Sequence, residues 1–358
     1  MRIETCLSSA DEQGRSAESR RDAKPEYSRF KWLTLAVGGA LALTATAFCK
    51  SPAYAAPLTA PGEEAGLNAA APLPEGVYFV NIYGAGGNYL VDDKRSNLSF
   101  DLPTIVWATP WQINLLGFTG RFEVIATPPI VQNLGTACLP SLGQCISARL
   151  GRDFTAMFNP FAEAGFAFDL GGGWSFSSFN GAYGPVDNEL RGTNDIWTYN
   201  NRSWLGWSGN LWGGGLKDGG ASPKFTFAGE SVLGLTGNNL QTGQRFFPDY
   251  WNINLTAYAT LGKWELGLIS FGSFDLENST PVTGCDNRSV ARCEQSRWAV
   301  GPLVGYEFPG ITLQAQYSFD VYDQNYRNLD GSRMQVNQFW LKSVIPLWTA
   351  PKLETSLK

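Results

Sequence analysis

Residues 251–275 read WNINLTAYATLGKWELGLISFGSFD, and this stretch decides the fold. Between positions 251 and 261 the odd positions are apolar, and the even positions carry Asn, Thr or Tyr. A period of two held over this length predicts a β-strand with one apolar and one polar face. Gly262-Lys263 predicts a short turn, and the alternation resumes at Trp264. The stretch therefore predicts a β-hairpin.

Each arm of this hairpin is long enough to cross a membrane. Eleven tilted residues rise about 25–30 Å, whereas strands of soluble proteins average about 5–6 residues. Trp251 and Trp264 stand at strand ends, where transmembrane barrels place girdles of aromatic side chains. Ile269 and Phe271 are exceptions, because they are apolar residues on the polar face of the second arm. The hairpin is typical of a membrane β-barrel.

The composition favours the same fold class. The chain has 358 residues, of which only 16% are charged and 13% are aromatic, with 40 Gly and no His. Average proteins carry about 25% charged residues. No apolar run long enough for a helical membrane span follows residue 48. A barrel whose outer face lies in lipid needs few charges, and this composition suits it.

Residues 1–55 are predicted to be a targeting segment. Basic residues precede an apolar run at 33–48, and Ala53-Tyr54-Ala55 offers the small residues that a signal peptidase reads. We predict cleavage before Ala56. Residues 1–28 carry no apolar pattern, and we interpret them as the product of a misassigned upstream start codon.

The same periodicity predicts an all-β, transmembrane, antiparallel up-and-down barrel of about twelve strands, with fourteen as the alternative. Predicted short turns at 171–173, 262–263 and 309–310 all follow even-numbered strands, as a barrel with both termini in the periplasm requires. Residues 56–75 are predicted to be a flexible lead-in, 76–348 the barrel and 349–358 a tail. The predicted strands are 76–83, 104–112, 121–128, 154–170, 174–183, 203–212, 224–235, 251–261, 264–275, 298–308, 311–323 and 335–348.

Four cysteines follow the predicted cleavage site, as two pairs in loop-like sequence. Cys138 and Cys145 form one pair, and Cys285 and Cys293 form the other. In an exported protein this arrangement predicts two local disulfides. The absence of histidine and of CxxC spacing disfavours a metal site. No cofactor is predicted.

Net charge and residue types exclude several function classes. Residues 1–55 hold 8 of the 27 basic and 6 of the 32 acidic residues, so the remainder carries a net charge of −7. A nucleic-acid partner would require a basic stripe. Hydrolases of the serine type activate serine with histidine, which this chain lacks. The expected partners are outer-membrane lipid and the barrel-assembly machinery, and the net charge leaves a neutral, cationic or apolar solute as the expected cargo. The sequence indicates no oligomeric state.

Side chains on the polar strand faces are predicted to line the lumen. In one interpretation Arg121 and Lys342 pair with acids and only satisfy a wet interior. In the other, Tyr258, Phe271 and Trp340 offer apolar contacts beside polar groups, as ligand sites do. The lumen and solute-path candidates are Arg121, Glu123, Glu230, Asn252, Asn254, Tyr258, Glu265, Phe271, Gln314, Gln316, Asp320, Trp340 and Lys342. The predicted membrane-interface aromatics are Trp251, Trp264, Trp298 and Trp348, together with Trp204, Trp207 and Trp212.

Four short motifs resemble a known family. They are residues 73–78 (LPEGVY), 181–185 (GAYGP), 242–243 (TG) and 262–267 (GKWELG). Their order and spacing over residues 73–348 are similar to those of outer-membrane proteins of a MetA-pathway of phenol degradation. That family is similar in architecture to FadL-like channels for hydrophobic compounds. The resemblance implies uptake of small hydrophobic or aromatic compounds, and it carries over no site residues.

The sequence therefore predicts a channel for passive uptake through the barrel lumen, in the outer membrane of a Gram-negative bacterium. The alternative is a structural or adhesive barrel that acts through its extracellular loops. Conductance distinguishes the two, because a plugged adhesin passes no ions.

Overall fold

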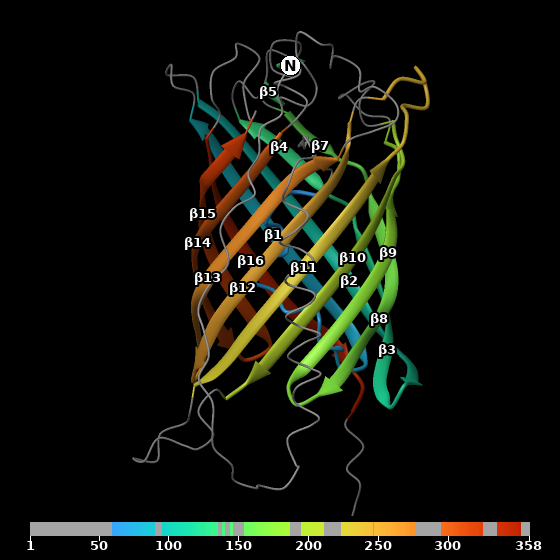
Figure 1. The fold of residues 1–358 in the computed structure, drawn as a ribbon, viewed down its shortest axis with the longest axis vertical. Helices are drawn as coiled ribbons and strands as arrows, with labels where there is room; N and C mark the ends of the chain where they lie inside the picture. The colour runs from blue at the N-terminus through green and yellow to red at the C-terminus, as the bar shows by residue number, and fades with distance from the viewer. Residues whose placement is uncertain are drawn as a thin grey trace, which may run out of the picture. The chain divides into compact units, whose positions relative to one another are not determined.

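The computed structural model describes residues 59–89, 95–134, 138–139, 144–145, 154–186, 195–210, 223–245, 247–276, 295–324 and 335–351. Within these residues twelve strands close into an antiparallel β-barrel (Figure 1). They are β1 Gly76–Tyr89, β2 Arg95–Leu115, β3 Phe118–Thr127, β8 Phe161–Gly171, β9 Trp174–Tyr183, β10 Thr198–Gly209, β11 Lys224–Thr236, β12 Asp249–Leu261, β13 Trp264–Leu276, β14 Ser296–Phe308, β15 Ile311–Gln324 and β16 Gln335–Thr349.

The barrel closes through β1, which pairs with β16 on one side and β2 on the other. Gly76 lies opposite Thr349 of β16 and Ala108 of β2. Every other barrel strand pairs with the barrel strands before and after it in the chain. The prediction of an up-and-down barrel of about twelve strands is confirmed. The described residues contain no helix that is long and apolar enough to cross a membrane.

Side chains alternate between the lumen and the outer face along each barrel strand. On β12, Asn252 and Asn254 are buried at 0% and 2% exposure, whereas Leu255 is 43% exposed on the outside. The hairpin predicted at residues 251–275 consists of β12 and β13, joined by the predicted turn at residues 262–263. Polar and apolar side chains alternate strictly along β12 because the two faces of the strand meet different surroundings.

Short turns gather at one end of the barrel, where β1 begins and β16 ends. The predicted turns at 171–173, 262–263 and 309–310 are confirmed. Gly262 and Gly310 have φ values of 64° and 80°, which a residue without a Cβ atom adopts readily. A further turn at residues 116–117 joins β2 to β3.

Several strands extend beyond their predicted bounds at the opposite end. Residues 84–101 were predicted to be a loop, but β1 and β2 stay paired up to Tyr89 and Arg95. Likewise β10 begins at Thr198, five residues before its predicted start. These ends are polar or rich in Gly, and backbone pairing holds them without an apolar face. Periodicity alone therefore could not detect them.

Two small pieces of sheet accompany the barrel. β4 (Ile130–Leu134) pairs with β2, and β7 (Phe154–Met157) pairs with β4, so the predicted strand 154–170 is split at Pro160. β5 (Cys138–Leu139) and β6 (Gln144–Cys145) form a separate pair.

The backbone register places Cys138 directly opposite Cys145. The disulfide between them remains a prediction. The described residues do not include Cys285, Cys293 or the predicted interface residue Trp212. They also do not include residues 1–58, with the predicted cleavage site, or residues 352–358.

Residues 59–75, which we call the strap, lie inside the barrel. Backbone and side-chain atoms of Thr59, Gly62 and Ala65 make hydrogen bonds to side chains of β9, β10, β12, β15 and β16. The predicted flexible lead-in includes the strap, and the structure places this part of it against the barrel wall. Its Ala, Gly and Pro content resembles a linker, yet its backbone groups find partners on the barrel wall.

The outward row of β12 generates a stability prediction. We expect Leu255→Arg to lower the free energy of unfolding in lipid vesicles by roughly 2–4 kcal/mol, because it puts a guanidinium at mid-strand in hydrocarbon. Gln241→Arg, in an exposed turn, is the control and should change it by less than about 0.5 kcal/mol. Equal effects would show that Leu255 does not face lipid.

The facing cysteines generate a second prediction. Without reductant, peptides that contain Cys138 and Cys145 should appear linked in a mass spectrum of the digested protein, and separate after reduction. Alkylation of both thiols in the native, unreduced protein would contradict the disulfide.

Candidate functional site

The predicted lumen residues all lie on the inner wall of the barrel. On each strand they occupy the alternate positions whose side chains point into the lumen. Most of them contact the strap or residues that contact it. Glu123, Glu230, Asn252, Asn254, Phe271, Gln314, Gln316, Trp340 and Lys342 are buried, and Arg121, Tyr258, Glu265 and Asp320 are partly buried.

One end of the strap is held by β3. The backbone N–H of Leu73 donates to Glu123 Oε1 at 2.8 Å. Arg121 Nη1 lies 3.9 Å from Glu75 Oε2 and also donates to the carbonyl of Thr109. These contacts fix the strap where it joins β1.

The middle of the strap is a tight turn bound by backbone recognition. Lys342 Nζ donates to the carbonyl oxygens of Gly62, at 3.2 Å, and Ala65. Gln316 Nε2 donates to the same Ala65 oxygen at 2.8 Å. From β12, Asn254 Oδ1 accepts the Gly62 N–H at 3.2 Å. Lys342 and Gln316 therefore hold the turn in place.

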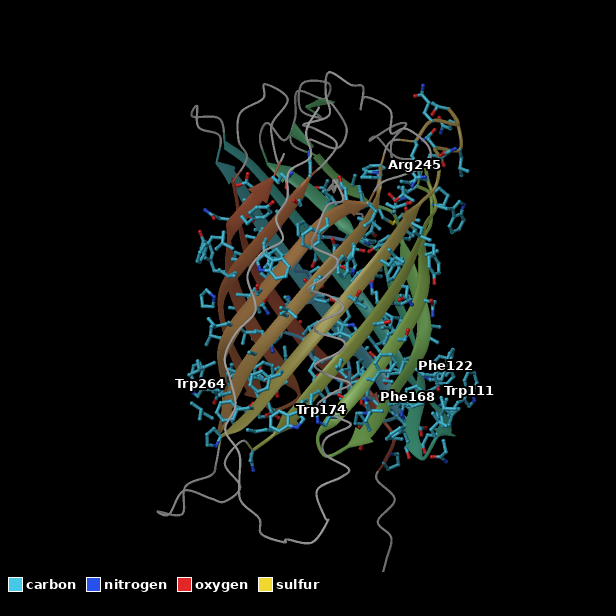
Figure 2. The ribbon with its side chains drawn as sticks, in the orientation of Figure 1. Trp111, Phe122, Phe168, Trp174, Arg245 and Trp264 are labelled. Atoms are coloured by element: carbon cyan, nitrogen blue, oxygen red, sulfur yellow. The ribbon has the colours of Figure 1, made fainter. Side chains whose placement is uncertain are left out.

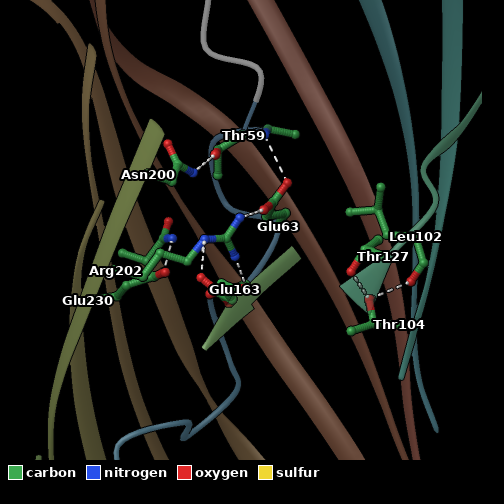
Figure 3. Close-up of polar contacts among 12 residues, drawn as sticks. Thr59, Glu63, Leu102, Thr104, Thr127, Glu163, Asn200, Arg202 and Glu230 are labelled. Atoms are coloured by element: carbon green, nitrogen blue, oxygen red, sulfur yellow. Dashed lines mark hydrogen bonds and ion pairs between the residues drawn. The ribbon is translucent and has the colours of Figure 1, made fainter. Parts of the chain in front are cut away.

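The same turn is held from another wall by Arg202 on β10. Arg202 Nη2 lies 2.9 Å from Glu63 Oε1 (Figure 3). Arg202 Nη1 pairs with Glu64. Its Nε lies 3.6 Å from Glu163 Oε2 on β8, and its guanidinium lies 4.6 Å from the Phe161 ring centroid. Arg202 is 3% exposed, so these are buried ion pairs.

Arg202 and Lys342 stand on opposite walls. Their strands, β10 and β16, lie six places apart in the closed order of twelve. The turn at 62–65 touches both cations, so it crosses the lumen from wall to wall. The strap thus spans the barrel at this level.

Burial of the strap changes the acidity of its first carboxyl group. Loss of hydration raises the pKa of Glu63 to about 7, although the nearby Arg202 guanidinium opposes the change. Glu64, the next residue, adds repulsion in the same upward direction.

Apolar side chains on the lumen wall also face the strap. Ile269 and Phe271, the two exceptions to the β13 alternation, pack with Ala65 of the strap and with Leu303. Trp204 and Ala228 pack with Ala70, and Trp340, Ile82 and Leu102 pack with Ala60 and Leu67.

The outer face carries most of the predicted interface aromatics. Trp264 and Trp348 are each 52% exposed, and Trp251 and Trp298 are half-buried on the outward face. Figure 2 shows Trp264, Trp174 and Trp111 toward the same end of the barrel, with Arg245 toward the other. The interface prediction for Trp204 is wrong: its position on β10 points inward, and it is 2% exposed.

Sequence reasoning missed the residues that hold the centre of the strap. Arg202 fell one residue before the predicted start of its strand, and Glu163 lay in a strand with no clear alternation. Thr59 shares hydrogen bonds with Tyr183 and Tyr250, both at 3.0 Å, and this network was also missed. The placement of Ile269 and Phe271 on a polar face was the one signal that something packs inside. Among the described residues no group of three or more His, Cys, Asp or Glu could hold a metal ion.

Comparison with solved structures relates the chain to membrane β-barrels. An outer membrane channel from Pseudomonas putida F1 superimposes with a TM-score of 0.54 at 13% identity, covering 78% of this chain and 98% of that one. A FadL homologue from Pseudomonas aeruginosa gives a TM-score of 0.37 at 9% identity, covering 83% and 100%. The first likeness shows a shared barrel fold, and the second is too low to carry an argument. No protein-family model and no curated protein matches the sequence.

The buried ion pairs generate a prediction. We expect Arg202→Met to destabilise the barrel by about 3–5 kcal/mol, because it leaves Glu63 and Glu163 buried without a cation. Lys224→Met is the control, since it removes an exposed cation at the start of β11 and should cost less than about 0.5 kcal/mol. Denaturant unfolding in detergent measures both, and equal costs would show that the Arg202 pairs hold nothing together.

Proposed function

We propose that this protein is a channel for passive uptake of small hydrophobic or aromatic compounds through the barrel lumen. The observation that carries this proposal is the character of the inner wall. Trp204, Phe271 and Trp340 are buried apolar side chains set among hydrogen-bonding groups such as Asn254 and Gln316. Ligand sites for apolar molecules combine these features.

The size of the barrel supports a small solute. Twelve strands enclose more room than an eight-stranded barrel, which its own side chains fill, and less than a porin of sixteen strands. The strap takes part of that room. Passage therefore requires the turn of the strap to move away from Arg202 and Lys342.

The proposed location is the outer membrane of a Gram-negative bacterium, after export with a cleaved signal peptide. Exposed apolar side chains such as Leu255, Leu266 and Phe319 would contact lipid, and the aromatic residues Trp264 and Trp348 would lie at the membrane interfaces. The barrel-assembly machinery would insert the chain. Membership of the MetA-pathway family of phenol degradation belongs to the same proposal and rests on the motifs in residues 73–78 and 262–267.

A second candidate function is a structural or adhesive barrel that acts through its extracellular loops. The observation that favours it is the strap, because residues 62–65 cross the lumen between Arg202 and Lys342. A permanently docked strap would prevent conduction, whereas a channel requires it to move.

Conductance and growth test the two functions together. We expect the full-length mature protein to conduct ions in planar bilayers, and Gln316→Ala to increase the open fraction because it removes a hydrogen bond that holds the strap. Gln241→Ala, in an exposed turn, is the matched control and should leave the open fraction unchanged.

The uptake of solutes is then tested in cells with and without the gene. Growth on a panel of hydrophobic carbon sources should slow on at least one of them when the gene is removed, and recover with the gene. If neither the parent protein nor its Gln316→Ala variant conducts ions, and if growth is equal on every source, the channel proposal is wrong and the adhesive barrel is favoured.

A further inference from the structure

Six charged side chains from five parts of the chain meet around the central turn of the strap. The strap brings Glu63 and Glu64, and the barrel wall brings Arg202, Lys342, Glu163 from β8 and Glu230 from β11. Arg202 pairs with Glu63, Glu64 and Glu163, and Lys342 lies within electrostatic reach of Glu63, Glu64 and Glu230. Five of the six residues are at most 5% exposed, and Glu64 is the more accessible one.

The charges of the barrel wall balance without the strap. Arg202 and Lys342 offset Glu163 and Glu230, so the wall alone is neutral when all four are ionised. When Glu63 and Glu64 of the strap are ionised, they therefore add two negative charges that no cation of the wall balances. A buried charge without a counter-charge is costly, and a carboxylic acid avoids the cost by binding a proton.

The remaining titratable groups around the cluster do not change this balance. Tyr183 on β9 accepts from Arg202 Nη2 at 3.1 Å, and Tyr250 on β12 bonds Thr59 and Asn200. Both are phenols, which are neutral at physiological pH because tyrosine ionises near pH 10.

The hydrogen bonds around Glu230 leave room for a proton. Glu230 Oε2 accepts from Asn254 Nδ2 at 2.5 Å, and Asn254 in turn accepts the Gly62 N–H of the strap. Glu230 Oε1 accepts no hydrogen bond from a donor group of the described residues, and the Glu64 carboxyl group lies close enough to share a proton with Glu230. Glu230 is 2% exposed. This carboxyl group connects the charge cluster to the backbone of the strap.

We propose that docking of the strap is linked to proton uptake: the strap crosses the lumen when the Glu63 carboxyl group, which it adds to the Arg202 cluster, is at least partly protonated, and it leaves as that group ionises. The proposal concerns the regulation of the lumen and rests on the proposed channel only for its consequence, an open path at higher pH. Release sends Glu63 and Glu64 into water and leaves a wall of balanced charge.

The sign follows from the two environments of Glu63. In water a glutamate titrates near pH ~4.3, whereas the docked group has its pKa raised to about 7 by burial. Its contribution to docking is complete below the lower value and is lost as the pH rises through the higher one. Between them each linked proton changes the docking equilibrium by up to about tenfold per pH unit.

Thiol labelling measures docking without any solute flux. Ala69→Cys places a probe in the strap, next to the Ser177 hydroxyl that bonds the Ala69 carbonyl, and Gln241→Cys places a reference in an exposed turn. The parent protein gives the background from its own cysteines. Maleimide rates are measured on the full mature chain from pH 5 to pH 8, and their ratio removes the common effect of thiol ionisation.

We expect the ratio of strap to reference labelling to rise severalfold across this range. Glu63→Gln should flatten the rise, because its amide stays neutral at every pH. Glu307→Gln should leave it intact, because that acid is exposed at the end of β14 and does not contact the strap. Ala65→Cys provides a second probe if the first disturbs packing.

A flat ratio in the parent, or an unchanged rise in Glu63→Gln, would overturn the proton linkage. A falling ratio would also overturn it, since it would show that attraction to Arg202 outweighs burial. Absence of solute flux with a rising ratio would overturn the channel alone.

Discussion

The structure depends on one constraint: the backbone of a strand in hydrocarbon must find all its hydrogen bonds within the protein. A sheet meets this constraint only if it has no edge. Here β1 removes both edges at once, because its register runs against β16 from Gly76 to Tyr89 and against β2 over the same residues. The outward alternation on β12 and the short turns at one end are consequences of this closure.

Closure creates an interior, and the chain fills it with its own segment. The strap is bound through its backbone by Lys342, Gln316 and Asn254, and through its acids by Arg202. Backbone recognition fixes its position with little demand on side-chain size. The acid–arginine contacts place charges in a poorly hydrated space, where their strength depends on protonation and on geometry.

The sequence predicted those parts of the fold in which the two faces of a strand meet different surroundings. Residues 251–261 and the turns containing Gly262 and Gly310 fall in that class. The strap does not, because its partners are remote: Gly62 and Lys342 are separated by 280 positions. Arg202 was missed for a related reason, since β10 begins in the polar residues 198–201, where backbone pairing and not an apolar face makes the strand.

The candidate site was thus only half predictable. Parity alone identified inward residues such as Asn254, Phe271 and Lys342, but it gave no indication of what they bind. The presence of Ile269 and Phe271 on a polar face had a physical cause inside the barrel, namely contact with Ala65. An apolar residue on a lumen face therefore indicates that a segment or a solute lies against it.

One measurement tests the crossing of the lumen most directly. Ala70 and Ala228 pack together with Trp204, one on the strap and one on β11. In the double variant Ala70→Cys/Ala228→Cys we predict that mild oxidation links the strap to the wall and that reduction releases it. The pair Ala70→Cys/Ala257→Cys, with its second cysteine on the outward row of β12, should stay unlinked. Failure of the first pair to link in the folded barrel, or equal linking of both pairs, would contradict a strap docked inside.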